Sequence, residues 1–130
     1  MKIIPILIII ILTSCSKLNN APNTALNITG TWRLTDSYDN YKNNTFQWNV
    51  VPDSTVILMQ LTTDNNYILK KNGTISYAAK YTYAKQVITL LQQDNTVGMQ
   101  YNIIGYSTNN TLQVSFTSNG NMYQQKLIRY

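Results

Sequence analysis

Apolar and polar residues alternate along most of the chain after residue 27, with a period of two residues. In the first such segment, residues 28–38, Trp32 and Leu34 occupy one face while Arg33 and Thr35 occupy the other. This period is typical of β-strands, and no stretch after residue 15 has the period of a helix. We predict eight strands, at residues 28–38, 54–62, 67–71, 74–84, 86–92, 97–106, 111–117 and 121–130.

Short turns separate the predicted strands. Asn72-Gly73 is the strongest hairpin indicator in the chain, and Asn119-Gly120 repeats it before the last strand. Short connections make consecutive strands antiparallel neighbours, and a meander of eight strands leaves two open edges unless it closes. The expected fold class is therefore all-β, an eight-stranded antiparallel up-and-down β-barrel. A two-sheet β-sandwich is the alternative.

A longer connection, residues 39–53, precedes the second predicted strand. Within it Phe46, Trp48 and Val50 alternate with polar or small residues, which predicts either a short extra strand or a lid. Such a segment can pack on the barrel as a separate cluster, close over its mouth, or bind a partner.

The residues at the end of this connection, Asp53-Ser54-Thr55, are similar to the three-residue acceptor of O-glycosylation in Bacteroidetes. The acceptor would be Ser54, at the end of a loop where an attached sugar has room. An unmodified loop is the alternative.

The N-terminus has a short basic start followed by an apolar run over residues 3–12. This run is too short to span a bilayer but matches the length of a signal-peptide core. Residues 12–15 (LTSC) resemble the bacterial lipobox, and Cys15 is the only cysteine in the chain. The resemblance implies a signal peptide at residues 1–14, cleavage before Cys15 and acylation of its thiol. Acyl chains on Cys15 would then anchor the protein to a membrane.

Residues 15–27 are rich in Asn, Ser and Thr and have no periodicity, so we expect a flexible tether ahead of a barrel domain at residues 28–130. No run of acidic residues follows Cys15. This absence favours the periplasmic face of the outer membrane, with exposure on the cell surface as the alternative.

Gly30 and Trp32 open the first predicted strand, and Arg129 lies near the end of the last. A glycine permits close approach of the backbone, and tryptophan supplies a large apolar side chain. The pattern resembles the first motif of the lipocalins, and the chain is similar to small lipocalin-like lipoproteins of Bacteroidetes-type bacteria. The resemblance implies that Arg129 packs over Trp32 to close one end of the barrel, and that the barrel holds a small ligand.

The amino-acid composition argues against several classes of function. The chain has 10 Lys and Arg against 5 acidic residues, a net charge of +5, one Cys and no His. The bases are scattered, so no nucleic-acid-binding face is expected. Without His, a zinc or copper site of the usual kind is not expected, and the commonest general base is missing. We therefore expect no metal, no cofactor and no enzyme activity.

Aromatic residues are the main candidates for lining the barrel. The chain has 10 Tyr, and Tyr combines an apolar body with a polar tip. The candidate ligand-binding residues are Ile75, Tyr77, Tyr81 and Tyr83 on one face of residues 74–84, with Met99, Tyr101, Val114 and Phe116 from two later strands. The alternative is that these side chains fill the core.

Two functional hypotheses follow from these patterns. The first is a membrane-anchored, lipocalin-like lipoprotein that binds a small apolar or amphiphilic molecule in its barrel. The second is a non-enzymatic interaction or inhibitor protein of the cell envelope, with a filled barrel and a protein partner bound through its loops. A cavity of roughly 300 Å3 or more favours the ligand, and a filled interior favours the partner.

Overall fold

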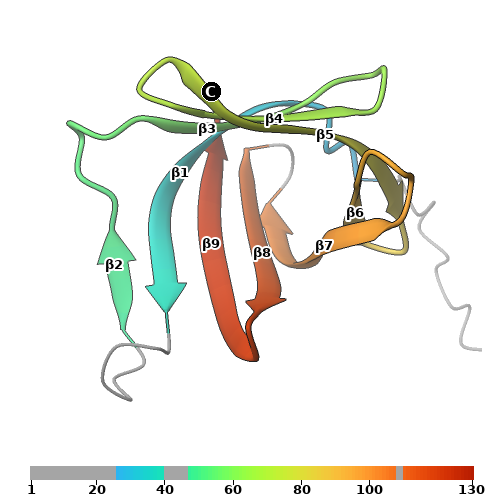
Figure 1. The fold of residues 1–130 in the computed structure, drawn as a ribbon. Coiled ribbons are helices and arrows are strands. Elements are labelled where there is room, and N and C mark those ends of the chain that lie inside the picture. The colour runs from blue at the N-terminus through green and yellow to red at the C-terminus, as the bar shows by residue number, and fades with distance from the viewer. Residues whose placement is uncertain (1–25, 40–46, 108–109) are drawn as a thin grey trace, which may run out of the picture.

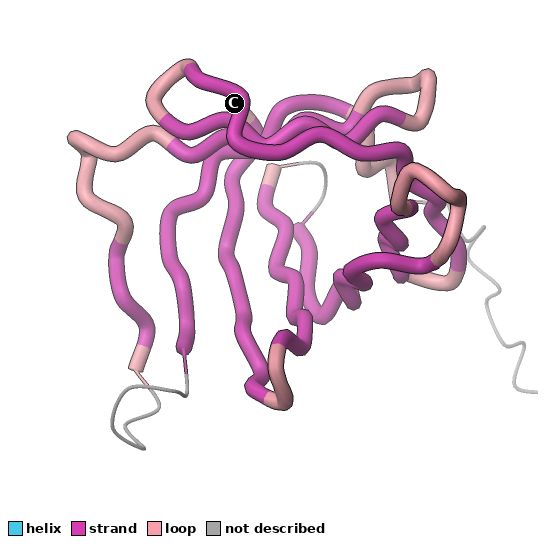
Figure 2. Tube along the Cα trace, viewed as in Figure 1, coloured by secondary structure: helices cyan, strands magenta, loops and turns pink. Residues whose placement is uncertain are grey.

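The computed structural model describes residues 26–39, 47–107 and 110–130, which form an all-β fold without helices (Figure 1). The strands are β1 (Gly30–Asp39), β2 (Trp48–Val50), β3 (Ile57–Leu61), β4 (Asn66–Lys71), β5 (Thr74–Ala84), β6 (Val87–Leu91), β7 (Val97–Ser107), β8 (Thr111–Ser118) and β9 (Asn121–Arg129). Figure 2 shows that strands make up most of the described trace. No helix in this part of the chain is long and apolar enough to cross a membrane. The expected signal peptide, Cys15 and most of the expected tether lie outside the described residues.

Strand β1 closes the sheet, because it pairs with β3 along one edge and with β9 along the other. From β3 to β9, each strand pairs antiparallel with the next strand in the sequence. Trp32 lies opposite Arg129 across the seam between β1 and β9. The closed barrel of eight antiparallel strands confirms the expected fold class and excludes the two-sheet sandwich.

The additional strand, β2, does not widen the barrel. Residues 30–33 of β1 pair with β3, whereas residues 36–38 pair with β2 on the same edge. Strands β2 and β3 are therefore two pieces of one barrel strand. The predicted strand start at residue 54 is wrong, because the Thr55 amide donates to the Pro52 carbonyl in a turn at 2.8 Å. The strand begins only at Ile57.

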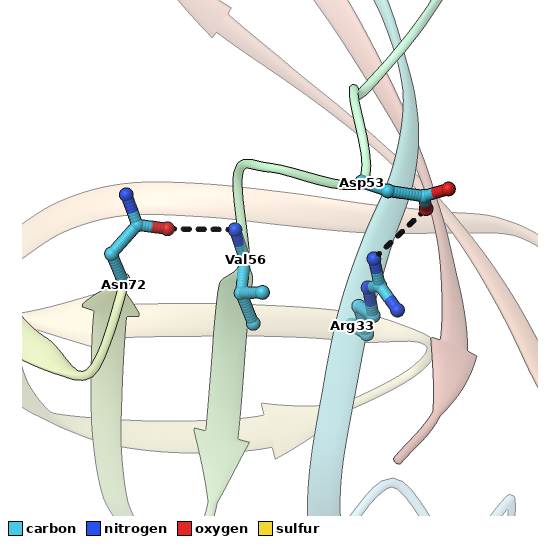
Figure 3. A network of polar contacts seen from close by, with 4 residues as sticks. All are labelled: Arg33, Asp53, Val56 and Asn72. Atoms are coloured by element: carbon cyan, nitrogen blue, oxygen red, sulfur yellow. Dashed lines mark hydrogen bonds and ion pairs between the residues drawn. The ribbon is translucent and has the colours of Figure 1, made fainter.

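Two polar contacts hold the segment between β2 and β3, residues 51–56 (Figure 3). Arg33 on β1 forms an ion pair with Asp53, with 3.3 Å between Nη2 and Oδ1. The Asp53 side chain of this ion pair is exposed, so the pair contributes little to the free energy of unfolding. The Val56 amide donates to Asn72 Oδ1 at 2.8 Å, and the Asn72 amide donates to the Val56 carbonyl at 2.7 Å. The turn between β4 and β5 thus fixes the approach to β3.

The core lies inside the barrel. Its most deeply buried side chains are Trp32, Leu61, Ile88, Leu90, Leu112 and Val114. Every buried apolar residue of the described chain lies between Ile28 and Leu127. The described strands therefore enclose a core of their own, as units that fold independently do.

Pairing between the strands is incomplete at the end of the barrel opposite Trp32. Strand β5 pairs with β6 only from Lys80 onwards, and β7 pairs with β8 only from Asn102 onwards. All of β6 is paired with β5, so the stretches that lack a neighbour beside the hairpin are residues 74–79 of β5 and residues 97–101 of β7.

Candidate functional site

Arg129 and Trp32 close the end of the barrel where β1 begins. Arg129 Cζ lies 4.3 Å from the centroid of the Trp32 ring, within the range of a cation–π contact. Arg129 also donates to two backbone carbonyls, from Nη1 to Thr29 at 2.8 Å and from Nη2 to Asn27 at 3.0 Å. The buried Trp32 Nε1 donates to the Ile28 carbonyl at 2.8 Å. These contacts fasten the last strand to the segment that leads into the first.

Gly30 makes room for this arrangement. Its φ is 132°, a value that favours glycine. A Cβ at this position would lie 2.5 Å from Arg129 Nη1. Gly30, Trp32 and Arg129 thus act together in closing the barrel, as the resemblance to lipocalins implies for this motif.

Five aromatic rings cross the barrel interior in one continuous row, which we call the aromatic belt. Its members are Tyr77 on β5, Tyr67 on β4, Tyr101 on β7, Phe116 on β8 and Tyr123 on β9. Successive ring centroids lie 6.0, 6.1, 5.0 and 5.2 Å apart. Edge-to-face and stacked pairs alternate along the row, and both geometries are favourable.

A chamber of about 530 Å3 lies beside the aromatic belt, and we call it the larger chamber. Its apolar and aromatic wall consists of Tyr67, Leu69, Tyr77, Leu90, Met99 and Tyr101. Polar residues line it at the end of β8 and in the turns that follow β6 and β8, among them Thr117, Gln92 and Asn119. An apolar wall with a few polar groups is typical of sites for small molecules.

A second chamber, of about 150 Å3, lies on the other side of Tyr67 and Tyr101. These two residues and Leu69 line both chambers. The remaining wall of this smaller chamber consists of Leu34, Ile57, Met59, Gln125 and Leu127. The Tyr67–Tyr101 pair therefore separates two parts of one barrel interior.

The hydroxyl groups of Tyr67 and Tyr101 lie 3.3 Å apart. Burial raises the pKa of Tyr67 far above its usual value, and the neighbouring Tyr101 and Tyr77 raise it further. Burial also raises the pKa of Tyr101, although its hydrogen bond to Tyr67 acts in the opposite direction. Both phenols stay protonated at physiological pH. No described residue that lines either chamber carries a charge.

A hollow of about 670 Å3 lies outside the chambers, between the edge of β5 and the β6–β7 turn. Its walls include the exposed residues Ala78, Lys80 and Asp94. We regard the two interior chambers as the better candidate site, because their walls are more apolar than those of this hollow and apolar walls are typical of small-molecule sites.

The candidate ligand-binding residues divide between the larger chamber and the core. Tyr77, Met99 and Tyr101 line the larger chamber, and Phe116 belongs to the aromatic belt. Val114 is fully buried in the core. The buried Tyr81 donates its hydroxyl to the Thr62 carbonyl at 2.9 Å, and Tyr83 packs against the core from its edge.

The expectation that Ile75 shares a face with Tyr77 is wrong. A register shift in the β4–β5 pairing places Tyr77 opposite Leu69 but Ile75 opposite Lys70. Adjacent residues of β4 point to opposite faces, so Ile75 lies on the outer face and is 58% exposed.

Sequence reasoning missed Tyr67, Leu69, Leu90 and Gln125 as wall residues. The alternation of β4 and β6 would have identified Tyr67, Leu69 and Leu90 as inward-facing, as it did for Tyr101, whereas the polar side chain of Gln125 suggests the outer face.

The expected lid residues were Phe46, Trp48 and Val50. Phe46 lies outside the described residues. Trp48 and Val50 belong to β2, so the structure has the short extra strand. The Trp48 ring lies 5.7 Å from that of Tyr38 and 4.0 Å from Lys126 Nζ, and Val50 is 76% exposed. Neither lines the chambers.

The fold and the two chambers define a lipocalin-like β-barrel with an apolar chamber that opens to solvent beside the β6–β7 and β8–β9 turns. No model of a known protein family matches the chain, and no curated protein matches it either. In the described part of the chain, no three His, Cys, Asp or Glu residues are grouped so that they could hold a metal ion. Ser54 is exposed in the loop before β3.

Proposed function

We propose that the protein binds a small apolar or amphiphilic molecule inside its barrel. The observation that carries this proposal is the larger chamber, with its volume of about 530 Å3. This volume lies within the usual range of small-molecule sites and above the roughly 300 Å3 that separates the two functional hypotheses. A barrel that acts only through its outer loops has no need for an apolar chamber.

The same proposal places the protein on a membrane. Acylation of Cys15 would anchor it to the outer membrane of a bacterium, facing the periplasm, with the barrel held off the bilayer by residues 16–27. The support for this part is the lipobox at residues 12–15 and the position of the only Cys. Two or three acyl chains on one residue suffice for stable anchoring. The protein would act as a binding protein rather than an enzyme.

Fluorescence titration with N-phenyl-1-naphthylamine, an uncharged probe that brightens in apolar surroundings, tests the ligand hypothesis. The chain starting at Ser16 is suitable, because the barrel has a core of its own. We expect saturable binding of one probe per barrel. A signal that does not saturate, or that is absent, would contradict the proposal and favour a protein partner.

Two variants locate the bound probe. Met99→Trp fills the larger chamber, and Thr117→Trp adds bulk at its exposed rim, so each should weaken binding at least tenfold. Gln100→Trp is the matched control, because Gln100 is exposed next to Met99 and bonds to Thr89 instead of lining the chamber. If all three variants bind the probe with equal affinity, the probe binds outside the larger chamber.

A further inference from the structure

Gln125 places an amide group in the otherwise apolar part of the smaller chamber. It lies on β9 between Val114 and Ser37 of the neighbouring strands, and Val114 is fully buried. No hydrogen bond from the Gln125 side chain to a described residue is present, although its neighbour Gln124 accepts one from Gln113 at 3.2 Å. Gln125 is only partly buried, so water can reach its amide in the empty barrel. A ligand that displaces this water without offering a hydrogen bond leaves the amide unpaired, which is unfavourable.

Tyr67 and Tyr101 line the same chamber, and their hydroxyl groups are hydrogen-bonded to each other. Their separation of 3.3 Å is long for a bond between two hydroxyl groups. A hydrogen bond between the two hydroxyl groups uses one of their two hydrogen atoms and one of their several lone pairs, so the other hydroxyl hydrogen and the remaining lone pairs stay available. Three residues that carry polar groups, from β4, β7 and β9, therefore line a space of about 150 Å3 and have hydrogen-bonding capacity beyond their contacts with described residues.

The absence of charge on the described walls restricts what these groups can bind. The base next to Gln125 in the sequence, Lys126, lies over the Trp48 ring, and Arg129 lies over Trp32 at the closed end of the barrel. A carboxylate brought into the chamber would lose its hydration without gaining a cation, which is strongly unfavourable. A hydroxyl, carbonyl or amide group would gain hydrogen bonds at no such penalty.

We infer that the ligand is an uncharged amphiphile that passes beside the Tyr67–Tyr101 pair along Leu69, which lines both chambers. Its hydrogen-bonding end lies in the smaller chamber against Gln125 and the tyrosine pair, and its apolar body lies in the larger chamber. This inference rests on the proposed function and adds the ligand's charge and orientation. In the opposite orientation, with the polar end at the open mouth, a charged end would remain in water and would be tolerated.

Displacement of N-phenyl-1-naphthylamine by 1-decanol and by decanoate at pH 8 tests the inference. The two competitors have the same chain length and differ in the charge of the polar end. We expect decanoate to bind at least about a hundredfold more weakly than decanol, because its carboxylate has no cation to pair with. Equal affinities, or failure of decanol to displace the probe, would overturn the inference while the proposed function stands. Failure of the probe itself to bind would overturn both.

Gln125→Leu separates a binding role from a structural one. We expect this variant to bind decanol about fivefold to tenfold more weakly, through the lost hydrogen bond, with unchanged affinity for the probe. Its Tm should rise, because an amide that lies beside apolar side chains is replaced by an apolar side chain. Gln124→Leu is the matched control and should leave the affinity for decanol unchanged. Equal loss of decanol affinity in both variants, or a lowered Tm with unchanged decanol affinity in Gln125→Leu, would overturn the inference.

Discussion

The Arg129 guanidinium, in the last strand, stacks on the Trp32 indole, in the first, with 4.3 Å between Cζ and the ring centroid. Only a closed sheet brings these two strands together, so this contact reports directly on closure of the barrel. The Arg129–Trp32 contact lies at the end of the barrel opposite the incompletely paired stretches of β5 and β7 beside the β6–β7 hairpin. Stability and ligand binding can therefore be tested with different substitutions.

Trp32→Ala should lower the free energy of unfolding by about 3–5 kcal/mol, since it removes a large buried side chain. Arg129→Ala should lower it by about 1–2 kcal/mol, through lost stacking and hydrogen bonds. The double variant should lose less than the sum, because the two residues share one interaction. Urea denaturation of the three variants measures this difference, and strict additivity would contradict the coupling.

Gly30→Ala should be more destabilising than Gly120→Ala. Both glycines have positive φ, 132° and 78°, but a Cβ on Gly120 meets nothing within 4 Å. Gly120→Ala therefore carries only the backbone penalty of about 1–2 kcal/mol. Gly30→Ala should exceed it by at least about 1 kcal/mol, because Arg129 must give up a hydrogen bond. If both variants lose a similar amount of unfolding free energy in urea denaturation, Arg129 keeps its hydrogen bonds when a Cβ is added at residue 30.

Stability should fall as the pH rises above 10. Tyrosines in the unfolded chain lose their protons near pH 10, whereas burial keeps Tyr67 and Tyr101 protonated in the folded barrel. Above that pH the folded state binds more protons, so each of the two groups subtracts about 1.4 kcal/mol per pH unit. Below pH 10 their contribution to stability is fully present.

Denaturation curves between pH 8 and 11 give this slope, and substitutions assign it. Tyr67→Phe should make the loss of unfolding free energy above pH 10 smaller by about 1.4 kcal/mol per pH unit, the contribution of one tyrosine. Tyr130→Phe serves as the control for the substitution itself, since Tyr130 is 70% exposed. A slope that Tyr67→Phe does not alter would contradict the assignment.

Cys15→Ser should abolish lipid attachment and leave the chain unprocessed or soluble. The expected acyl chains are carried by the Cys15 thiol, and the chain has no second Cys to replace it. Metabolic labelling with a palmitate analogue in a bacterial host measures attachment. Equal labelling of the wild-type chain and the variant would contradict the expected anchor.

Strand positions were predictable because one face of each strand is buried, which imposes a period of two residues on the sequence. The turn at Asn72 was predictable as well, because its backbone has a positive φ of 49°, which Asn tolerates better than most residues. Shifts in register follow no such pattern. The shift between Leu69 and Lys70 reverses the face on which Ile75 lies, and no single residue type marks its position.

The chambers could be predicted only in part. Alternation identifies Tyr77, Met99 and Tyr101 as inward-facing, but it does not distinguish a filled interior from a hollow one. That distinction depends on how side chains from several strands fit together. Gln125 illustrates the difficulty, because its polar side chain suggests an outer face until Val114 and Leu127 are seen beside it.

Because of the incomplete pairing beside the β6–β7 hairpin, the release rate of the proposed ligand and the unfolding rate of the barrel would depend on different parts of the molecule. In the described strands, β5 pairs with β6 only from Lys80 and β7 pairs with β8 only from Asn102, so the turn at residues 92–96 can move without breaking pairs with either neighbour. The escape rate of the proposed ligand would then depend on this local movement. The lifetime of the folded barrel depends on the seam at Trp32, so each rate can be altered by substitution without changing the other.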